Sequence, residues 1–105
     1  MNQQQFDWAL DVAETGIRKA APESVWAPHF AASMAHIERA EIDEAFADSE
    51  AATAGCKMPA CRPTDKTRIG LIHSTLLQVV NSELPLIEAY EQARKPLIRV
   101  SSGAR

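Results

Sequence analysis

The sequence predicts an all-α fold, a single-domain bundle of three to four helices. Eighteen of the 105 residues are alanine, which loses the least side-chain entropy in a helix. Apolar residues recur at intervals of three and four, as they do on one face of a helix. Only four glycines and 6% aromatic residues disfavour a strand-rich barrel. A chain of this length accommodates one hydrophobic core, so we expect one domain over residues 1–105.

The first predicted helix covers residues 3–19. Its apolar stripe repeats with the helical period and consists of Phe6, Leu10, Ala13 and Ile17. Pro22 closes this element, because proline cannot continue a hydrogen-bonded helix. Trp8 and Trp26 are expected to fill the core, as tryptophan usually does in a chain of this size. The alternative is that they anchor an interface, because tryptophan is enriched among binding hot spots.

The second predicted helix covers residues 28–53, with Pro28 in its first turn and Gly55 as its stop. Its apolar face changes direction partway. The first line consists of Phe30, Met34 and Ile37 and continues as Glu41, Glu44 and Asp48, whereas Ala35, Ile42 and Phe46 form a second line. The two lines are rotated by about 130° at about 100° per residue. We predict one unbroken helix that packs on two different neighbours, and a homodimer seam if the second line is uncovered.

The third and fourth predicted helices cover residues 65–81 and 83–95. The third has an apolar face of Ile69, Ile72, Leu76, Val79 and Val80. Ser82 is a suitable N-cap for the fourth, whose expected buried line is Leu86, Tyr90, Ala93 and Leu97, although Pro96 is expected to end it before Leu97. A kinked continuation of the third helix is the alternative. The tail over 100–105 is expected to be flexible.

Charge divides the chain into two unlike parts. Residues 1–55 hold ten of the fourteen acidic side chains and three basic ones, a net charge of −7, whereas residues 56–105 carry a net charge of +4. A Gly/Cys/Pro loop over residues 55–63 separates them. Opposite charges attract when the parts fold together and offer two different surfaces to partners.

The acidic residues of the second helix are the leading candidate for a partner-binding surface. The candidate residues are Glu38, Glu41, Glu44 and Asp48, with Ile42 and Phe46 as apolar neighbours. Carboxylates on one face would steer a protein with a basic surface toward the helix. Two other interpretations stay open: a solvated face that keeps the protein soluble, or a face that docks on the basic half of the same chain or on a second copy.

The two cysteines suggest a further alternative, a small metal- or redox-linked protein. Four residues separate Cys56 from Cys61, whereas the paired cysteines of a zinc ribbon are usually separated by two. His29 and His36 lie about 10.5 Å apart along a helix, so we do not expect them to share an ion. No metal and no cofactor is predicted. Both thiols are expected to be reduced in the cytoplasm, with a redox-sensitive or intramolecular disulfide between them as the alternative.

A DNA-binding regulator is the second alternative and would use residues 64–82. Gly70 and the apolar residues that follow resemble the turn and second helix of a helix-turn-helix in part, but the leading half of that motif is missing. Its phosphate contacts would come from Lys57, Arg62, Lys66 and Arg68. The spacing of residues matches no nucleophile elbow, zinc-protease or nucleotide-binding motif, so we do not expect an enzyme.

These patterns together favour a non-catalytic protein–protein interaction module that acts through an acidic helix surface. The N-terminus has neither the basic nor the apolar region of a signal peptide, and no apolar run approaches the ~20 residues of a membrane span, so we expect a cytoplasmic protein without membrane contact. Small acidic proteins of this kind include phage and plasmid inhibitors of host machinery such as CRISPR complexes. We expect that role only by analogy, because those inhibitors are also small, acidic, single-domain proteins without recognisable motifs.

Overall fold

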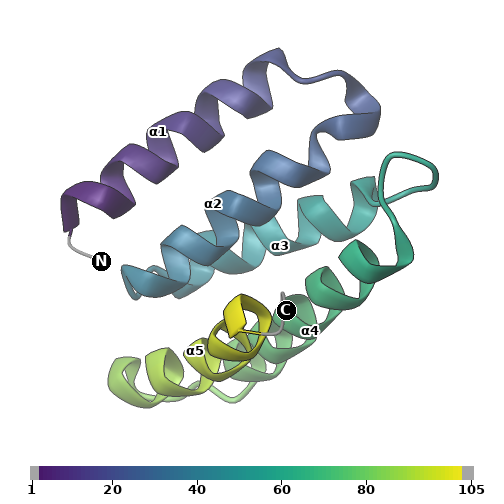
Figure 1. Cartoon of the computed structure of the whole chain (residues 1–105). Coiled ribbons are helices and arrows are strands. Elements are labelled where there is room, and N and C mark those ends of the chain that lie inside the picture. Colours follow the sequence, from purple (N-terminus) through teal and green to yellow (C-terminus); the bar gives the residue numbers. More distant parts are fainter. Residues whose placement is uncertain (1–2, 103–105) are drawn as a thin grey trace.

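The structure, a computed structural model, describes residues 3–102, which form five α-helices and one short 3-10 helix, with no β-strand in this range. The elements are α1 (Gln3–Lys19), η1 (Pro22–Ser24), α2 (Trp26–Glu38), α3 (Ile42–Gly55), α4 (Pro63–Asn81) and α5 (Leu86–Ser102). Figure 1 shows three tiers: α1, then the pair α2 and α3, then the pair α4 and α5. The all-α prediction is confirmed, but the described residues hold five helices instead of three to four.

Helix α1 has the predicted bounds, and its apolar stripe packs on α2. Leu10 and Ala13 are buried against Ala32 and Ala35 of α2. The prediction that Trp8 fills the core is wrong, because this side chain is 70% exposed on the opposite side of α1. Trp26 is partly buried at the end of α3, as expected.

The predicted helix over 28–53 is two helices, α2 and α3, joined by a tight turn. Ala40 adopts a left-handed backbone with φ of 59°. The N–H of Glu41 donates to the carbonyl of His36 (2.9 Å) and the N–H of Ala40 to that of Ile37 (2.9 Å), which is the Schellman ending of a helix. The change of apolar face that sequence analysis assigned to a straight helix therefore marks a reversal of the chain.

Helix α4 begins two residues earlier than predicted, at Pro63, and has the predicted buried face. Proline suits the first turn because its missing N–H has no partner there in any helix. The Asp65 carboxylate accepts a hydrogen bond from the N–H of Arg62 (3.1 Å), which caps the same turn. The buried side chains of α4 are Ile69, Ile72, Leu76 and Val79.

Helix α5 differs most from its predicted range of 83–95. Ser82 ends α4 instead of starting α5, and Glu83 follows it with a left-handed φ of 51°. Pro96 lies inside α5, and the next residue, Leu97, is buried in the core. Burial of Leu97 favours continuation of the helix even though proline removes a hydrogen bond there. Residues 100–102 belong to α5, while 103–105 lie outside the described residues, so flexibility of the tail stays a prediction.

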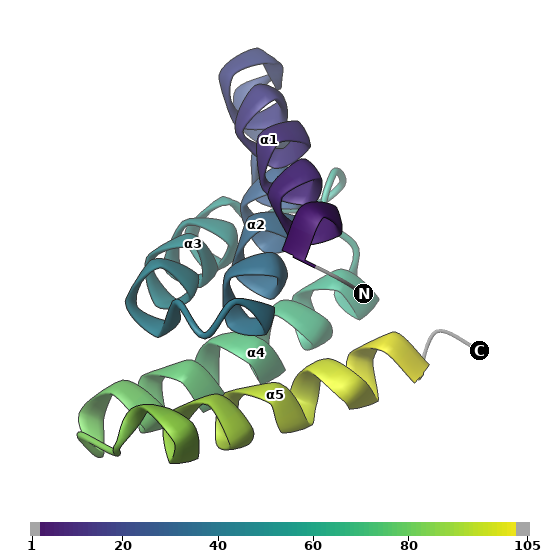
Figure 2. The same ribbon diagram turned by 90° about the vertical axis from the view of Figure 1, so that its left-hand side faces the viewer.

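The main core joins α2, α3, α4 and α5, with α1 outside it (Figure 2). Its buried members are Ile37, Ile42, Ala45, Ile72, Leu76, Val79, Ala89, Ala93 and Leu97. Leu86, expected in the buried line of the last helix, is 62% exposed, and Ala89 takes its place. No helix in the described part of the chain combines the length and apolar content that crossing a lipid bilayer demands.

Candidate functional site

The predicted acidic surface is divided between three parts of the chain because the helix breaks at Ala40. Glu38 ends α2, Glu41 lies in the turn, and Glu44 and Asp48 are on α3. They therefore do not form one continuous line. Glu38, Glu41 and Asp48 find partners within the molecule, and only Glu44 is exposed without a hydrogen bond or ion pair to another described residue.

Glu38 pairs with the basic half of the chain. The Nε of Arg94 on α5 donates a hydrogen bond to Glu38 Oε1 (2.9 Å), and the guanidinium also lies over the ring of Tyr90. The hydrogen bond to Glu38 raises the pKa of Arg94 above its usual value. For this one residue the structure agrees with the interpretation in which the acidic face docks on the chain's own basic half.

Glu41 and Asp48 belong to a partly buried cluster with two histidines. The Nδ1–H of His29 donates to Asp48 Oδ1 (2.8 Å), and that of His36 donates to Glu41 Oε1 (2.8 Å), since an ionised carboxylate can only accept. Nε2 of His36 lies 3.5 Å from the other Asp48 oxygen. Both histidines of α2 therefore lie next to the Asp48 carboxylate of α3, and these contacts connect the two helices.

The histidine cluster extends to α1 through one arginine. Arg39 Nη1 donates to Asp7 Oδ1 on α1 (2.7 Å), and its Nε lies 3.3 Å from Glu41 Oε1. These contacts tie together the ends of α1, α2 and α3, which is a structural role. Among the described residues no three His, Cys, Asp or Glu side chains converge as the ligands of a metal ion do.

The two apolar residues of the predicted partner surface lie inside the molecule. Ile42 is 9% exposed and belongs to the main core. Phe46 is partly buried, and its ring stacks on that of His73 with centroids 5.6 Å apart. Ala35, the third member of the proposed dimer seam, is buried under α1. The predicted seam is therefore covered: α1 covers Ala35, and the turn at Ala40 folds Ile42 and Phe46 back onto the core.

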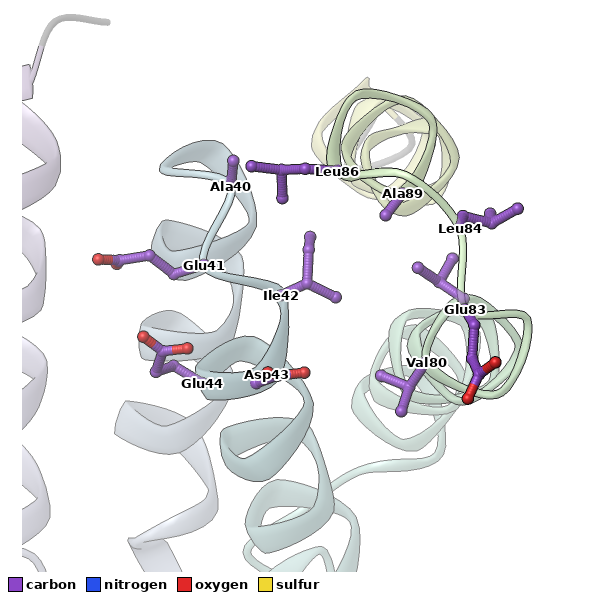
Figure 3. A pocket seen from close by; sticks show the side chains of 11 residues that line it. Ala40, Glu41, Ile42, Asp43, Glu44, Val80, Glu83, Leu84, Leu86 and Ala89 are labelled. Atoms are coloured by element: carbon purple, nitrogen blue, oxygen red, sulfur yellow. The ribbon is translucent and has the colours of Figure 1, made fainter.

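A groove lies where the start of α3, the end of α4 and the start of α5 meet (Figure 3). Its volume is about 450 Å³. The lining residues are Ala40, Glu41, Ile42, Asp43, Glu44, Val79, Val80, Glu83, Leu84, Leu86 and Ala89. Leu86, Ala89 and Val80 provide one wall and Ile42 the facing one (Figure 3). The groove thus has apolar side chains on both walls, with carboxylates among its lining, and is open to solvent.

Among the described residues, carboxylates are the only charged groups that line this groove. Figure 3 shows Asp43 directed toward the gap between α3 and α4, whereas Glu41 and Glu44 point away from it. Glu83 lies on the opposite wall, in the connection between α4 and α5. Asp43 and Glu83 are both exposed, and neither has an ion pair or hydrogen bond with another described side chain. Their uncompensated charge gives the groove a negative potential.

The loop over 56–62 is closed by a disulfide between Cys56 and Cys61, whose Cα atoms are 5.0 Å apart. The expectation of reduced thiols is wrong for this structure, since the reversal of the loop brings the two sulfurs together. Cys61 is buried against Ala52 and Ile69, which anchors the loop. Met58, at its tip, is 69% exposed.

The four basic residues assigned to DNA binding gather around this loop. Lys57 and Arg62 are exposed in the loop, and Lys66 and Arg68 follow in the first two turns of α4. Gly70 lies within α4, so no helix-turn-helix forms there. Contact of these cations with phosphate stays a prediction.

Comparison of the chain with protein-family models, with curated proteins and with solved structures finds no match. Function must therefore be argued from the surface itself. Sequence analysis missed the groove, because Leu84, Leu86 and Ala89 meet Ile42 only after the chain has folded. Asp43 was visible as a neighbour of the predicted acidic residues, but no local signal separated it from the paired carboxylates.

Proposed function

We propose that the protein is a non-catalytic interaction module whose groove binds a partner protein. The partner would present an apolar side chain flanked by lysine or arginine. The observation that carries this proposal is the pairing of an open apolar groove with two exposed carboxylates, Asp43 and Glu83, that no cation of the described chain neutralises. A small inhibitor of phage or plasmid type, directed at host machinery such as a CRISPR complex, is one role for such a module.

The carboxylates that are paired within the molecule have a structural role in this proposal, whereas the sequence predicted that they contact the partner. Glu38, Glu41 and Asp48 hold the helices together, so replacing them would disturb the fold before it disturbed a partner. Asp43 and Glu83 are free to pair with an incoming cation, and such a pair forms partly desolvated against the apolar wall. The groove would fix the position of the apolar anchor, while the carboxylates would increase the association rate.

A titration followed by NMR tests this proposal. The probe is a synthetic amphipathic helical peptide of leucine and lysine, and the control is its leucine and glutamate counterpart. We expect the lysine peptide to shift the amide signals of Ile42, Asp43 and Glu83, with an affinity that falls as salt is added. The glutamate peptide should shift none of them.

A matched pair of variants distinguishes binding in the groove from non-specific hydrophobic association of the peptide. Leu86 and Ile87 are neighbours in the first turn of α5 and are 62% and 74% exposed, but only Leu86 lines the groove. Leu86→Ser should weaken binding of the lysine peptide at least tenfold, and Ile87→Ser should leave it unchanged. Equal effects of the two substitutions would contradict the proposal.

A further inference from the structure

The disulfide loop and the groove lie at opposite ends of α4, and Figure 2 shows the course of this helix from one end to the other. The loop precedes Pro63, the first residue of α4, and the groove is lined by Val79, Val80 and the residues after Asn81. A helix of 19 residues is about 28 Å long. One molecule therefore cannot place its own loop in its own groove.

The chemistry of the loop is complementary to that of the groove. Met58 is an exposed apolar tip, and Lys57 and Arg62 are exposed on either side of it in the sequence. Methionine is flexible and fills irregular apolar spaces. The groove offers apolar side chains on both walls, with Asp43 at the start of α3 and Glu83 in the connection between α4 and α5. Each surface thus presents an apolar centre between two charges, and the charges are opposite in sign.

The disulfide prepares this loop for binding. It holds Cys56 and Cys61 together, and Cys61 is 2% exposed, so the loop is fixed at its base. A segment that is ordered before it binds loses little conformational entropy in the complex.

We infer that the groove of one molecule binds the disulfide loop of a second copy of this chain, so that copies associate head to tail. This inference rests on the proposed function, because the loop is an occupant of the class proposed there. The contact is heterologous: it joins two different surfaces and leaves a free loop and a free groove at the ends of each assembly. The surfaces are small, so the association should be weak, concentration-dependent and sensitive to salt.

Sedimentation of the full chain tests this inference. At low salt we expect the average mass to rise above 11.5 kDa with protein concentration, and to return to that value in 1 M salt. Met58→Asp removes the apolar tip and repels the groove, and the double variant Asp43→Lys, Glu83→Lys reverses the groove charge. Each variant alone should stay monomeric. The five positions changed in these variants and in the control variant are all exposed, and circular dichroism verifies that each variant folds.

Mixing the two variants gives the decisive result. The loop variant retains an intact groove, and the groove variant retains an intact loop, so an equimolar mixture should form a one-to-one dimer and nothing larger. The control Glu50→Lys, Glu91→Lys changes the net charge equally at exposed positions outside the groove and should associate like the original chain.

Other outcomes overturn the inference in distinguishable ways. If the original chain stays monomeric at low salt while the lysine peptide still binds the groove, self-association is wrong and the proposed function stands. If neither occurs, both are wrong. Association that survives reversal of Asp43 and Glu83 but is lost in Trp8→Ser would place the interface on the exposed face of α1 and would likewise refute a head-to-tail contact.

Discussion

Helix α1 and the four-helix core are held by different kinds of packing. The core of α2 to α5 is built from branched aliphatic side chains such as Ile37, Ile72 and Leu76, all fully buried. The seam between α1 and α2 is built from Leu10 and three alanines, Ala13, Ala32 and Ala35. Alanines let two helices approach closely but remove little apolar area from water. The stability of the fold should therefore come mainly from the core, with α1 docked on it as a weaker unit.

Two further contacts hold α1 in place. Gly16 lies against Pro28 of α2, so close that a Cβ on Gly16 would stand 3.0 Å from the proline Cβ. Arg39 reaches from the end of α2 to Asp7 of α1. The seam therefore depends on the absence of side-chain atoms at Gly16 and on the Arg39–Asp7 ion pair at the surface. The predictions below test this contrast in order of expected effect.

Leu76→Ala should have the largest effect. Leu76 is fully buried at the centre of the core, and truncation there loses apolar burial and leaves a cavity. We expect the free energy of unfolding to fall by about 2–5 kcal/mol. Urea denaturation followed by circular dichroism measures it. A loss below about 1 kcal/mol would show that the core can collapse around the missing atoms.

Leu10→Ala should cost less and act locally. This side chain is the one large buried residue in the α1–α2 cluster, so its removal should cost about 2 kcal/mol, the low end for a buried leucine. Hydrogen exchange should then accelerate in α1 while the amides of α4 keep their protection. Equal acceleration in both helices would contradict the view of α1 as a separately docked unit.

Two glycines give a matched test of the close approach. A Cβ at Gly70, in the exposed middle of α4, would meet no atom within 4 Å, so Gly70→Ala should stabilise the protein by about 0.5–1 kcal/mol. Gly16→Ala carries the same gain in helix propensity but must push α1 away from Pro28. We expect no net gain at Gly16, as measured by urea denaturation. An equal increase in the free energy of unfolding at both positions would show that α1 can move away from Pro28 without loss of stability.

Arg39→Ala should have the smallest effect. Its contacts with Asp7 and Glu41 are at the surface, where ion pairs contribute at most about 1 kcal/mol. The loss should shrink further in 0.5 M salt. Arg18→Ala is the control, since the described contact of Arg18 is to Thr15 within α1. A loss at Arg39 that salt leaves unchanged would assign its role to packing of the side chain.

Local patterns in the sequence were reliable wherever neighbours along one helix decide the structure. The bounds of α1 and the buried face of α4, from Ile69 to Val79, follow from spacings of three and four residues. These spacings set which side chains share a face, whatever the rest of the chain does.

The breaks between helices required long-range contacts. Ala40 takes a left-handed backbone that costs an L-residue about 1–2 kcal/mol, and no glycine marks the position. Packing of Ile42 on α4 and α5 compensates for that cost. Likewise Pro96 predicts a helix end, but burial of Leu97 continues α5 past it. The residues next to Ala40 and Pro96 in the sequence do not reveal that Ile42 and Leu97 will be buried by distant helices.

The sequence by itself therefore determined an all-α protein, the faces of its helices and the separation of charge along the chain. Only the tertiary structure decided which carboxylates are paired and which are free, because Arg94 reaches Glu38 across 56 positions and His29 reaches Asp48 across 19. It also decided the groove, whose walls come from three segments of the chain. A periodic pattern records the neighbours of a residue on its own helix, whereas partners and cavities depend on where the chain turns back.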